Sequence, residues 1–354
     1  SVDTLKYVCC IVLCFRYKTE NWLTHRAMYF CESKFWDSNL TWYTEQPQLT
    51  PCFQSTVLVY TPALSLVLLG VWDLVTCYHS RSRTVPWSGR LIAKVSLTSV
   101  ALAIALLELV SAIYVYTTVE TLFLADILAP VVKISSYLIS LGLLMTNKHF
   151  GQVVSTAQFL FWTVNCLCLG LSTLSEAFGR IEDVPFTEIA LMISGLVVSV
   201  IMFILNCFAD LQPLYSEWDD QADENDCPRK LASVPSRVLY TWMDSLLFKG
   251  FRHPLTSSDL WNLNPEDRLT TTVPALESKL DKENVSILAT LFKCHWPTFI
   301  LLTVLYISKT LLSLVNPQII DMVISFVEED QETWKGYLYM FLFGAVTLGY
   351  GQEL

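Results

Sequence analysis

Seven apolar runs separated by polar loops are the feature that most constrains this sequence. Each run is close to the roughly 20 residues that an α-helix needs to cross a bilayer, and a helix bonds all its backbone groups within the span. We predict spans at residues 57–78, 91–114, 124–145, 153–174, 189–208, 296–316 with an apolar extension to 326, and 336 to the end. Charged residues make up 16% of the chain, below the roughly 25% of soluble domains. The sequence therefore predicts an all-α polytopic membrane protein.

The spacing of these runs divides the chain into five parts. Residues 1–27 begin with Ser and hold one apolar run too short to span, so we expect an upstream-translated or non-native segment. We then expect an extracellular N-terminus at 28–56, a five-helix accessory transmembrane bundle at 57–209, a cytosolic linker at 210–293 and the first two helices of another transmembrane domain at 294–354.

The distribution of Lys and Arg sets the expected orientation, because cytoplasmic loops carry an excess of both. The loop after the first span is basic, the loop after the second carries only Glu120, and the linker is again basic around Arg229. The N-terminus is therefore expected outside and the linker in the cytosol. An acidic run at 217–226 is expected to be a solvated tether. The formal net charge of -10 argues against nucleic acid as a partner.

Three residues near the N-terminus carry predictions that depend on this orientation. Asn39 begins an acceptor pattern for N-glycosylation in the expected exterior segment. Cys31 and Cys52 flank it in an oxidising compartment, so we predict a disulfide, with two unpaired thiols as the alternative. A second acceptor pattern at Asn284 is expected to stay bare in the cytosol. The remaining cysteines and the five histidines lack the spacing of a metal site, so no metal is expected.

Charged side chains inside predicted spans are costly and suggest function by default. They are Asp73, Glu108, Asp126, Lys133 and Lys309. Asp126 and Lys133 are seven residues apart and share a helix face, so they can pair across helices or face a wet crevice. For the first four residues we favour pairing between helices or snorkelling over transport.

The linker holds a mosaic of polar and apolar residues that predicts docked structure. Its apolar side chains recur at helical spacing, which predicts one amphipathic helix over 236–249. This helix is expected on the cytosolic membrane face or against neighbouring helices. Residues 255–261 are expected to form a turn into a short docked segment, and 284–294 an interfacial elbow before the sixth span. The helix positions are Leu239, Trp242, Met243, Leu246 and Leu247.

Several blocks in order resemble the long multidrug resistance-associated proteins, which are ATP-binding cassette (ABC) transporters of subfamily C. The linker blocks are Arg252-His-Pro-Leu and Ser258-Asp-Leu-Trp-Asn-Leu-Asn-Pro-Glu-Asp, which contain Asp259, Leu260 and Trp261 and are similar to the segment called the lasso. The others are Phe30-Cys, Trp36-Asp-x-Asn-x-Thr-Trp, Cys52-Phe-Gln-x-Thr-Val-Leu-Val, Pro317-Gln-Ile-Ile and Trp334-x-Gly-Tyr. The resemblance covers residues 28–354 and implies a five-helix accessory domain, a lasso linker and the first two helices of an ABC exporter transmembrane domain.

The resemblance also implies an activity that this chain does not contain alone. Such transporters hydrolyse ATP with Mg in cytosolic domains that carry a GxxxxGK[ST] phosphate loop, and this sequence has no such loop. We therefore expect a non-catalytic fragment or truncated isoform of a longer, ATP-hydrolysing parent. The plasma membrane is the expected location, with the vacuolar or lysosomal membrane as alternatives.

The family exports organic anions, notably glutathione, glucuronide and sulfate conjugates. A basic residue in its sixth span contributes to substrate binding. The aligned position here is Tyr306, with Lys309 one turn further, so these two are the candidate substrate-binding residues. The alternative for Lys309 is structural pairing or snorkelling.

Two other functions remain open. The bundle and linker could act as a targeting or interaction module, as a channel-regulating subunit similar to the sulfonylurea receptors would. A seven-span receptor is the more remote alternative, because the third span ends in Met145-Thr-Asn-Lys and no Asn-Pro-x-x-Tyr run lies in the seventh.

Overall fold

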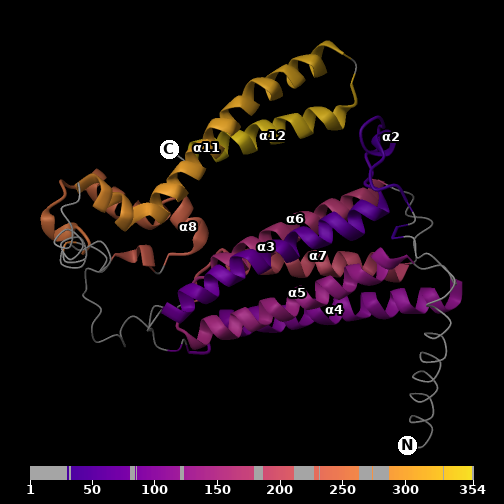
Figure 1. Ribbon diagram of the computed structural model, residues 1–354, viewed down its shortest axis with the longest axis horizontal. Helices are drawn as coiled ribbons and strands as arrows, with labels where there is room; N and C mark the ends of the chain where they lie inside the picture. Colours follow the sequence, from indigo (N-terminus) through magenta and orange to yellow (C-terminus); the bar gives the residue numbers. More distant parts are fainter. Residues whose placement is uncertain are drawn as a thin grey trace, which may run out of the picture.

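The computed structural model describes residues 30–352, except 32, 80–83, 85, 120–122, 179–185, 211–226, 231, 263–272, 274–286 and 330. The elements of this part are helices (Figure 1). The predictions for residues 1–27, for the acidic run at 217–226 and for Asn284 lie outside the described residues.

Five long helices run side by side and form one bundle (Figure 1). They are α3 (Pro51–His79), α4 (Gly89–Val119), α5 (Leu124–His149), α6 (Thr156–Phe178) and α7 (Phe186–Asn206). α3 packs against α5 and α6, α4 packs against α5 and α7, and α6 packs against α7. All five are long and apolar enough to cross a membrane. The first five predicted spans are therefore confirmed, and several helices extend beyond their predicted ends.

The bundle core combines large rings with small residues. Trp162 and Phe161 are fully buried, and the Tyr137 ring stacks on Trp162 with centroids 5.8 Å apart. The Trp162 indole N–H donates to Gln158 Oε1 at 3.2 Å, which satisfies a donor that would be costly unpaired in the core. Ala101 and Ala105 of α4 lie in the same core, where small side chains let helices approach closely in a membrane.

Two further helices form a hairpin that stands apart from the bundle (Figure 1). α11 (Ile287–Glu328) has 42 residues, and α12 (Thr333–Gln352) has 20. The predicted elbow at 284–294 and the predicted sixth span are not separate, because one continuous helix carries both from Ile287 onward. α11 is the sixth helix with the length and apolarity to span, while α12, which carries the seventh predicted span, does not belong to that set.

The predicted single helix over 236–249 is wrong. α8 (Val234–Val238) ends after five residues, and Tyr240 adopts the left-handed region with φ 57°. A short 3-10 turn, η4 (Thr241–Met243), and then α9 (Asp244–Arg252) follow. The left-handed residue interrupts the helical hydrogen-bond ladder, so Leu239 and Leu246 do not share one helix face.

Residues 30, 31 and 33–50, called the strap below, cross one end of the bundle before α3 begins. They include the short helix α2 (Ser38–Thr41). The Phe30 carbonyl accepts from Ala125 N–H of α5 at 3.0 Å, and the Gln48 side chain donates to the Phe178 carbonyl of α6 at 3.1 Å. These contacts define a strap end of the bundle, and the opposite end, where α7 leads into the linker, is the linker end.

Candidate functional site

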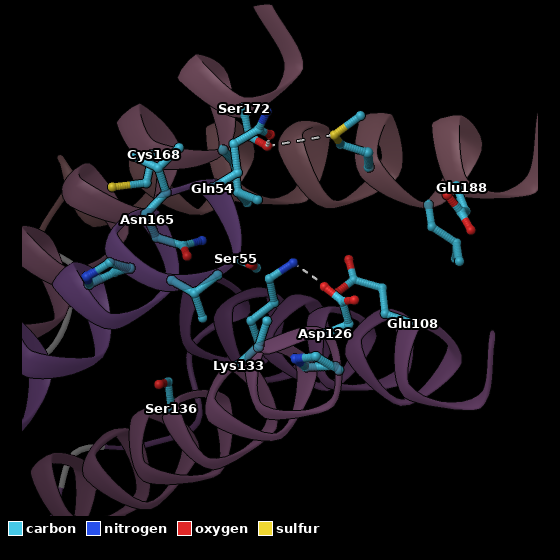
Figure 2. Close-up of a pocket in the computed structure, with 18 of the residues that line it drawn as sticks. Gln54, Ser55, Glu108, Asp126, Lys133, Ser136, Asn165, Cys168, Ser172 and Glu188 are labelled. Carbon is cyan, nitrogen blue, oxygen red and sulfur yellow. Dashed lines mark hydrogen bonds and ion pairs between the residues drawn. The ribbon is translucent and has the colours of Figure 1, made fainter. Parts of the chain in front are cut away.

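A cavity lined by both apolar and charged residues opens among the five bundle helices (Figure 2). Its volume is about 370 Å³, within the roughly 300–1,000 Å³ range of small-molecule sites. The charged residues that line it are Glu108, Asp126, Lys133, Glu176 and Glu188. Every helix of the bundle contributes to the lining, so the cavity exists only in the assembled bundle.

An ion pair between two helices crosses the cavity. Lys133 Nζ of α5 lies 2.8 Å from Glu108 Oε2 of α4, and both side chains are about one-fifth exposed. Placing a single charge inside a membrane span is costly, and pairing lowers that cost. The preference for structural pairing between helices is thus confirmed for these two residues. Asp126, which shares a helix face with Lys133, also lines the cavity.

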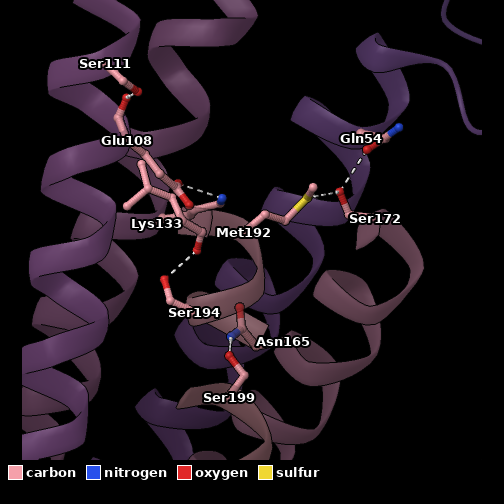
Figure 3. Close-up of polar contacts among 10 residues, drawn as sticks. Gln54, Glu108, Ser111, Lys133, Asn165, Ser172, Met192, Ser194 and Ser199 are labelled. Carbon is pink, nitrogen blue, oxygen red and sulfur yellow. Dashed lines mark hydrogen bonds and ion pairs between the residues drawn. The ribbon is translucent and has the colours of Figure 1, made fainter. Parts of the chain in front are cut away.

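A second group of polar contacts joins α3, α6 and α7 (Figure 3). Gln54 Oε1 accepts from Ser172 Oγ at 2.8 Å, and its amide nitrogen donates to Glu176 Oε1 at 3.2 Å. Deeper in the bundle, Asn165 Nδ2 donates to Ser199 Oγ at 2.9 Å. Because these side chains satisfy one another, the bundle can keep polar groups at this depth.

Asp73 has a structural role at the linker end. Its carboxylate accepts hydrogen bonds from the Ser155 hydroxyl and, at 3.3 Å, from the Ala157 N–H. These donors lie at the start of α6, where backbone N–H groups lack helical partners. Asp73 therefore joins α3 to the start of α6, as the preference for pairing between helices predicted.

The residues just after α7 are held by an ion pair and by hydrogen bonds to backbone carbonyls. Lys94 of α4 is almost fully buried, and its Nζ lies 2.7 Å from Asp210 Oδ1. Arg90 Nη1 donates to the Ala209 carbonyl at 2.7 Å, and Asp210 N–H donates to the Val153 carbonyl at 3.3 Å. These contacts hold the residues just after α7 against α4 and the segment before α6.

The strap also reaches the α11–α12 hairpin. Trp334 Nε1 of α12 donates to the Thr44 carbonyl at 2.9 Å, and the Trp42 and Trp334 rings meet edge to face at 5.6 Å. The Lys335 ammonium lies within 6.0 Å of the rings of Trp42, Tyr43 and Trp334, an arrangement typical of cation–π attraction. One short segment therefore holds bundle and hairpin together at this end.

A disulfide links the strap to the first turn of α3. The predicted bond between Cys31 and Cys52 is present, and Cys52 N–H donates to Ser33 Oγ at 3.2 Å within the same loop. Asn39 is exposed on α2, so glycosylation there remains a prediction.

The structure does not bring the predicted substrate residues to the cavity. Tyr306 and Lys309 lie on α11, and Tyr306 is 71% exposed. Neither lines the cavity among the bundle helices. Their role in substrate binding remains a prediction.

The predicted lasso residues are brought together locally. The rings of Trp242 and Trp261 lie 5.8 Å apart, and Lys249 Nζ lies 2.5 Å from Asp259 Oδ1. Asp259 Oδ2 also accepts from the Thr256 N–H and hydroxyl. These contacts hold the pKa of Asp259 well below its usual range. The other lasso residues are less enclosed: Arg252, Leu239 and Leu260 are exposed, and Met243 and Leu246 are half-buried.

Sequence reasoning missed most of the polar cavity lining. Asn165, Ser172 and Glu176 recur at intervals of seven and four residues on α6, a spacing that places them on one helix face. A polar stripe of this kind inside an apolar run could have predicted the polar cavity lining. Gln54 and Glu188 lie near the ends of their helices and gave no periodic signal.

Comparison with known proteins identifies a domain that includes the first four bundle helices. Residues 29–181 match the ABC transporter TMD0 domain. The ATP-binding cassette sub-family C member 3 of Mus musculus is 28% identical over 351 residues, which are 86% of this chain and 22% of that protein. The protein of the same name from Rattus norvegicus is 32% identical over 246 residues, 66% of this chain and 16% of that protein.

A different member of the subfamily gives the same picture. The ATP-binding cassette sub-family C member 2 of Homo sapiens is 27% identical over 258 residues, 72% of this chain and 16% of that protein. The chain thus spans only about a fifth of the length of the curated relatives it matches. The match and these relatives agree: residues 29–181 carry a TMD0 domain of the ABC transporters, and the chain is similar to the N-terminal part of sub-family C proteins.

Proposed function

We propose that this chain is the N-terminal portion of an ATP-dependent exporter of organic anions, including glutathione, glucuronide and sulfate conjugates. The observation that carries the proposal is the TMD0 match together with relatives that are sub-family C members. In this proposal ATP and Mg are bound by the parts of the transporter that carry nucleotide-binding domains, and this chain supplies the accessory domain, the lasso and the first helices of the transport domain.

The packing of α11 supports this division of roles. None of the residues in its most apolar stretch is buried, and Leu301, Tyr306 and Leu314 are each more than half exposed. A spanning helix of a transport domain packs against further helices of that domain. In the proposal, the remainder of the transporter and membrane lipid are therefore the partners of α11.

The proposal includes an orientation and a location. The strap lies outside, where Asn39 is glycosylated and the disulfide between Cys31 and Cys52 persists, and the linker lies in the cytosol. The excess of Lys and Arg in the loop after α3 supports this orientation. The plasma membrane is the proposed location, with the vacuolar or lysosomal membrane as alternatives.

Transport in membrane vesicles tests the proposed export. Inside-out vesicles carrying the whole protein should take up a glutathione conjugate when ATP is supplied and not when a non-hydrolysable analogue replaces it. The absence of ATP-dependent uptake would overturn the exporter proposal. In the same vesicles, Lys309→Met should lower uptake more than Lys309→Arg, because an anion ligand requires the charge.

A channel-regulating or targeting role is the alternative proposal. The observation that favours it is that the bundle completes its own core without the hairpin. Co-purification of the chain with a channel subunit, combined with no conjugate uptake by the whole protein, would favour this role over export.

A further inference from the structure

We propose that the bundle cavity binds a protonated amine attached to an apolar body. The amine can belong to the head group of an aminophospholipid or to a free amphiphilic molecule, and the chemistry of recognition is the same. The site lies in the accessory bundle, away from Tyr306 and Lys309, so the proposal does not depend on export.

The five helices leave a space large enough for a small molecule. About 370 Å³ remains between the five helices, although closely packed cores leave few voids larger than a water molecule. Two polar residues that line the cavity, Ser136 and Asn165, are 5% and 6% exposed, so its inner part lies within the core (Figure 2). A cavity of this size and depth fits a ligand and exceeds what a single bridging water fills.

The wall of the cavity is divided into two chemical parts. Leu58, Val59, Pro62, Phe161 and Leu169 supply an apolar surface. Three of the carboxylates lie near helix ends, because Asp126 and Glu188 are in the first turns of α5 and α7 and Glu176 is in the last turn of α6. Figure 2 shows the ion pair of Glu108 and Lys133 beside Asp126. A ligand with one charged end and one apolar end matches this division, because each part of it meets a surface of its own kind.

The sign of the ligand charge follows from the lining. Among the described residues, four carboxylates and one ammonium line the cavity, and the ammonium of Lys133 is already held by Glu108 at 2.8 Å. Glu176 is held by a neutral amide of Gln54, and Glu188 is exposed at the rim. Negative charge within a span is costly, and a ligand ammonium offsets it. An anionic ligand would add to the repulsion, so the cavity favours a cation.

Native mass spectrometry of the full chain can measure this binding. The chain is reconstituted in vesicles of equal parts phosphatidylethanolamine and phosphatidylglycerol and then extracted in mild detergent. The mass of the extracted protein shows which lipid it has retained. A second arm adds dodecylamine to vesicles of phosphatidylglycerol alone. We expect either the amine lipid or dodecylamine to be retained about tenfold over phosphatidylglycerol, a factor that corresponds to roughly one charge contact. Retention in the first arm identifies a lipid head group as the source, and retention in the second arm alone identifies a free amine.

Three variants make the test specific. Glu176→Gln combined with Glu188→Gln should lower retention about tenfold, and Ser55→Phe should abolish it by filling the cavity while leaving every carboxylate in place. The matched control, Glu329→Gln combined with Glu332→Gln, removes two carboxylates between α11 and α12 that do not line the cavity and should change nothing. Circular dichroism confirms that each variant keeps its helices. Retention of neither amine above phosphatidylglycerol, or equal retention in all variants, would overturn the proposal.

Discussion

The bundle and the α11–α12 hairpin have similar apolarity but very different packing. Within the bundle, Leu66, Trp162 and Met202 are fully buried and form one core. In α11 the most apolar stretch has no buried residue, and Leu302 is 57% exposed. The outer surfaces of the bundle and of α11 are both apolar enough to contact lipid, so apolarity alone does not distinguish these two regions. The difference shows that bundle positions are fixed by contacts within this chain, whereas the bilayer or other helices must cover α11.

Matched leucine substitutions test this comparison with the largest expected effect. Leu66→Ala should lower the free energy of unfolding by about 3 kcal/mol, because it leaves a cavity in a packed core. Leu302→Ala in α11 should cost less than about 1 kcal/mol, because an exposed side chain loses few contacts. Unfolding in mixed micelles, followed by circular dichroism, measures both. Equal losses would break the comparison.

The ion pair in the cavity gives the next largest expected effect. Lys133→Met leaves Glu108 without its cation inside the bundle and should cost about 2 kcal/mol, less than a fully buried pair because both side chains are partly exposed. The double variant Glu108→Gln with Lys133→Met should recover most of that loss, since no charge remains unpaired. If the double variant is as unstable as the single one in the same unfolding assay, Lys133 does not stabilise the bundle by pairing with the charge of Glu108.

The contact of the strap with α12 should have a smaller effect on global stability and a clear local one. Trp334→Ala removes the indole donor to the Thr44 carbonyl and the ring contact with Trp42. We expect amide exchange in the first turns of α12 to rise about fivefold, which corresponds to roughly 1 kcal/mol. Hydrogen–deuterium exchange with mass spectrometry measures it. Trp296→Ala, at an indole that is 54% exposed on α11, is the matched control and should leave α12 unchanged.

The lasso should show the smallest effect, as a dependence on pH. Lys249 and Thr256 hold the pKa of Asp259 below its usual value. The stabilisation is therefore present at neutral pH and is lost as the pH falls through the usual aspartate range toward the lowered pKa. Exchange of the α9 amides should rise in acid, and Asp259→Asn should remove that dependence. An unchanged acid response in the variant would assign the effect to another group.

Local features of the sequence were sufficient for some of these elements. The five bundle spans follow from run length and apolarity, and the disulfide was predicted from Cys31 and Cys52 near an expected exterior acceptor site. The single helix predicted over 236–249 is wrong, although the apolar residues of this segment do recur at helical spacing. Spacing does not reveal that Tyr240 takes a left-handed conformation, because periodicity reports which side chains are apolar and not where the backbone turns.

The contacts between distant residues were even harder to predict from local sequence patterns. The sequence predicted that Lys133 would pair, but its partner Glu108 lies 25 residues away on another helix. The contact of Thr44 with Trp334 joins residues 290 positions apart. Nothing in a local pattern states which of several helices will be neighbours.

The sequence by itself determined that this chain is a set of membrane helices with a structured linker, because span length and hydropathy are properties of consecutive residues. Only the tertiary structure decided which charges meet, that a cavity remains among five helices, and that the strap joins the bundle to α12. Those features depend on groups from separate segments arriving at one place, and the packing of the helices and the strap sets that arrangement.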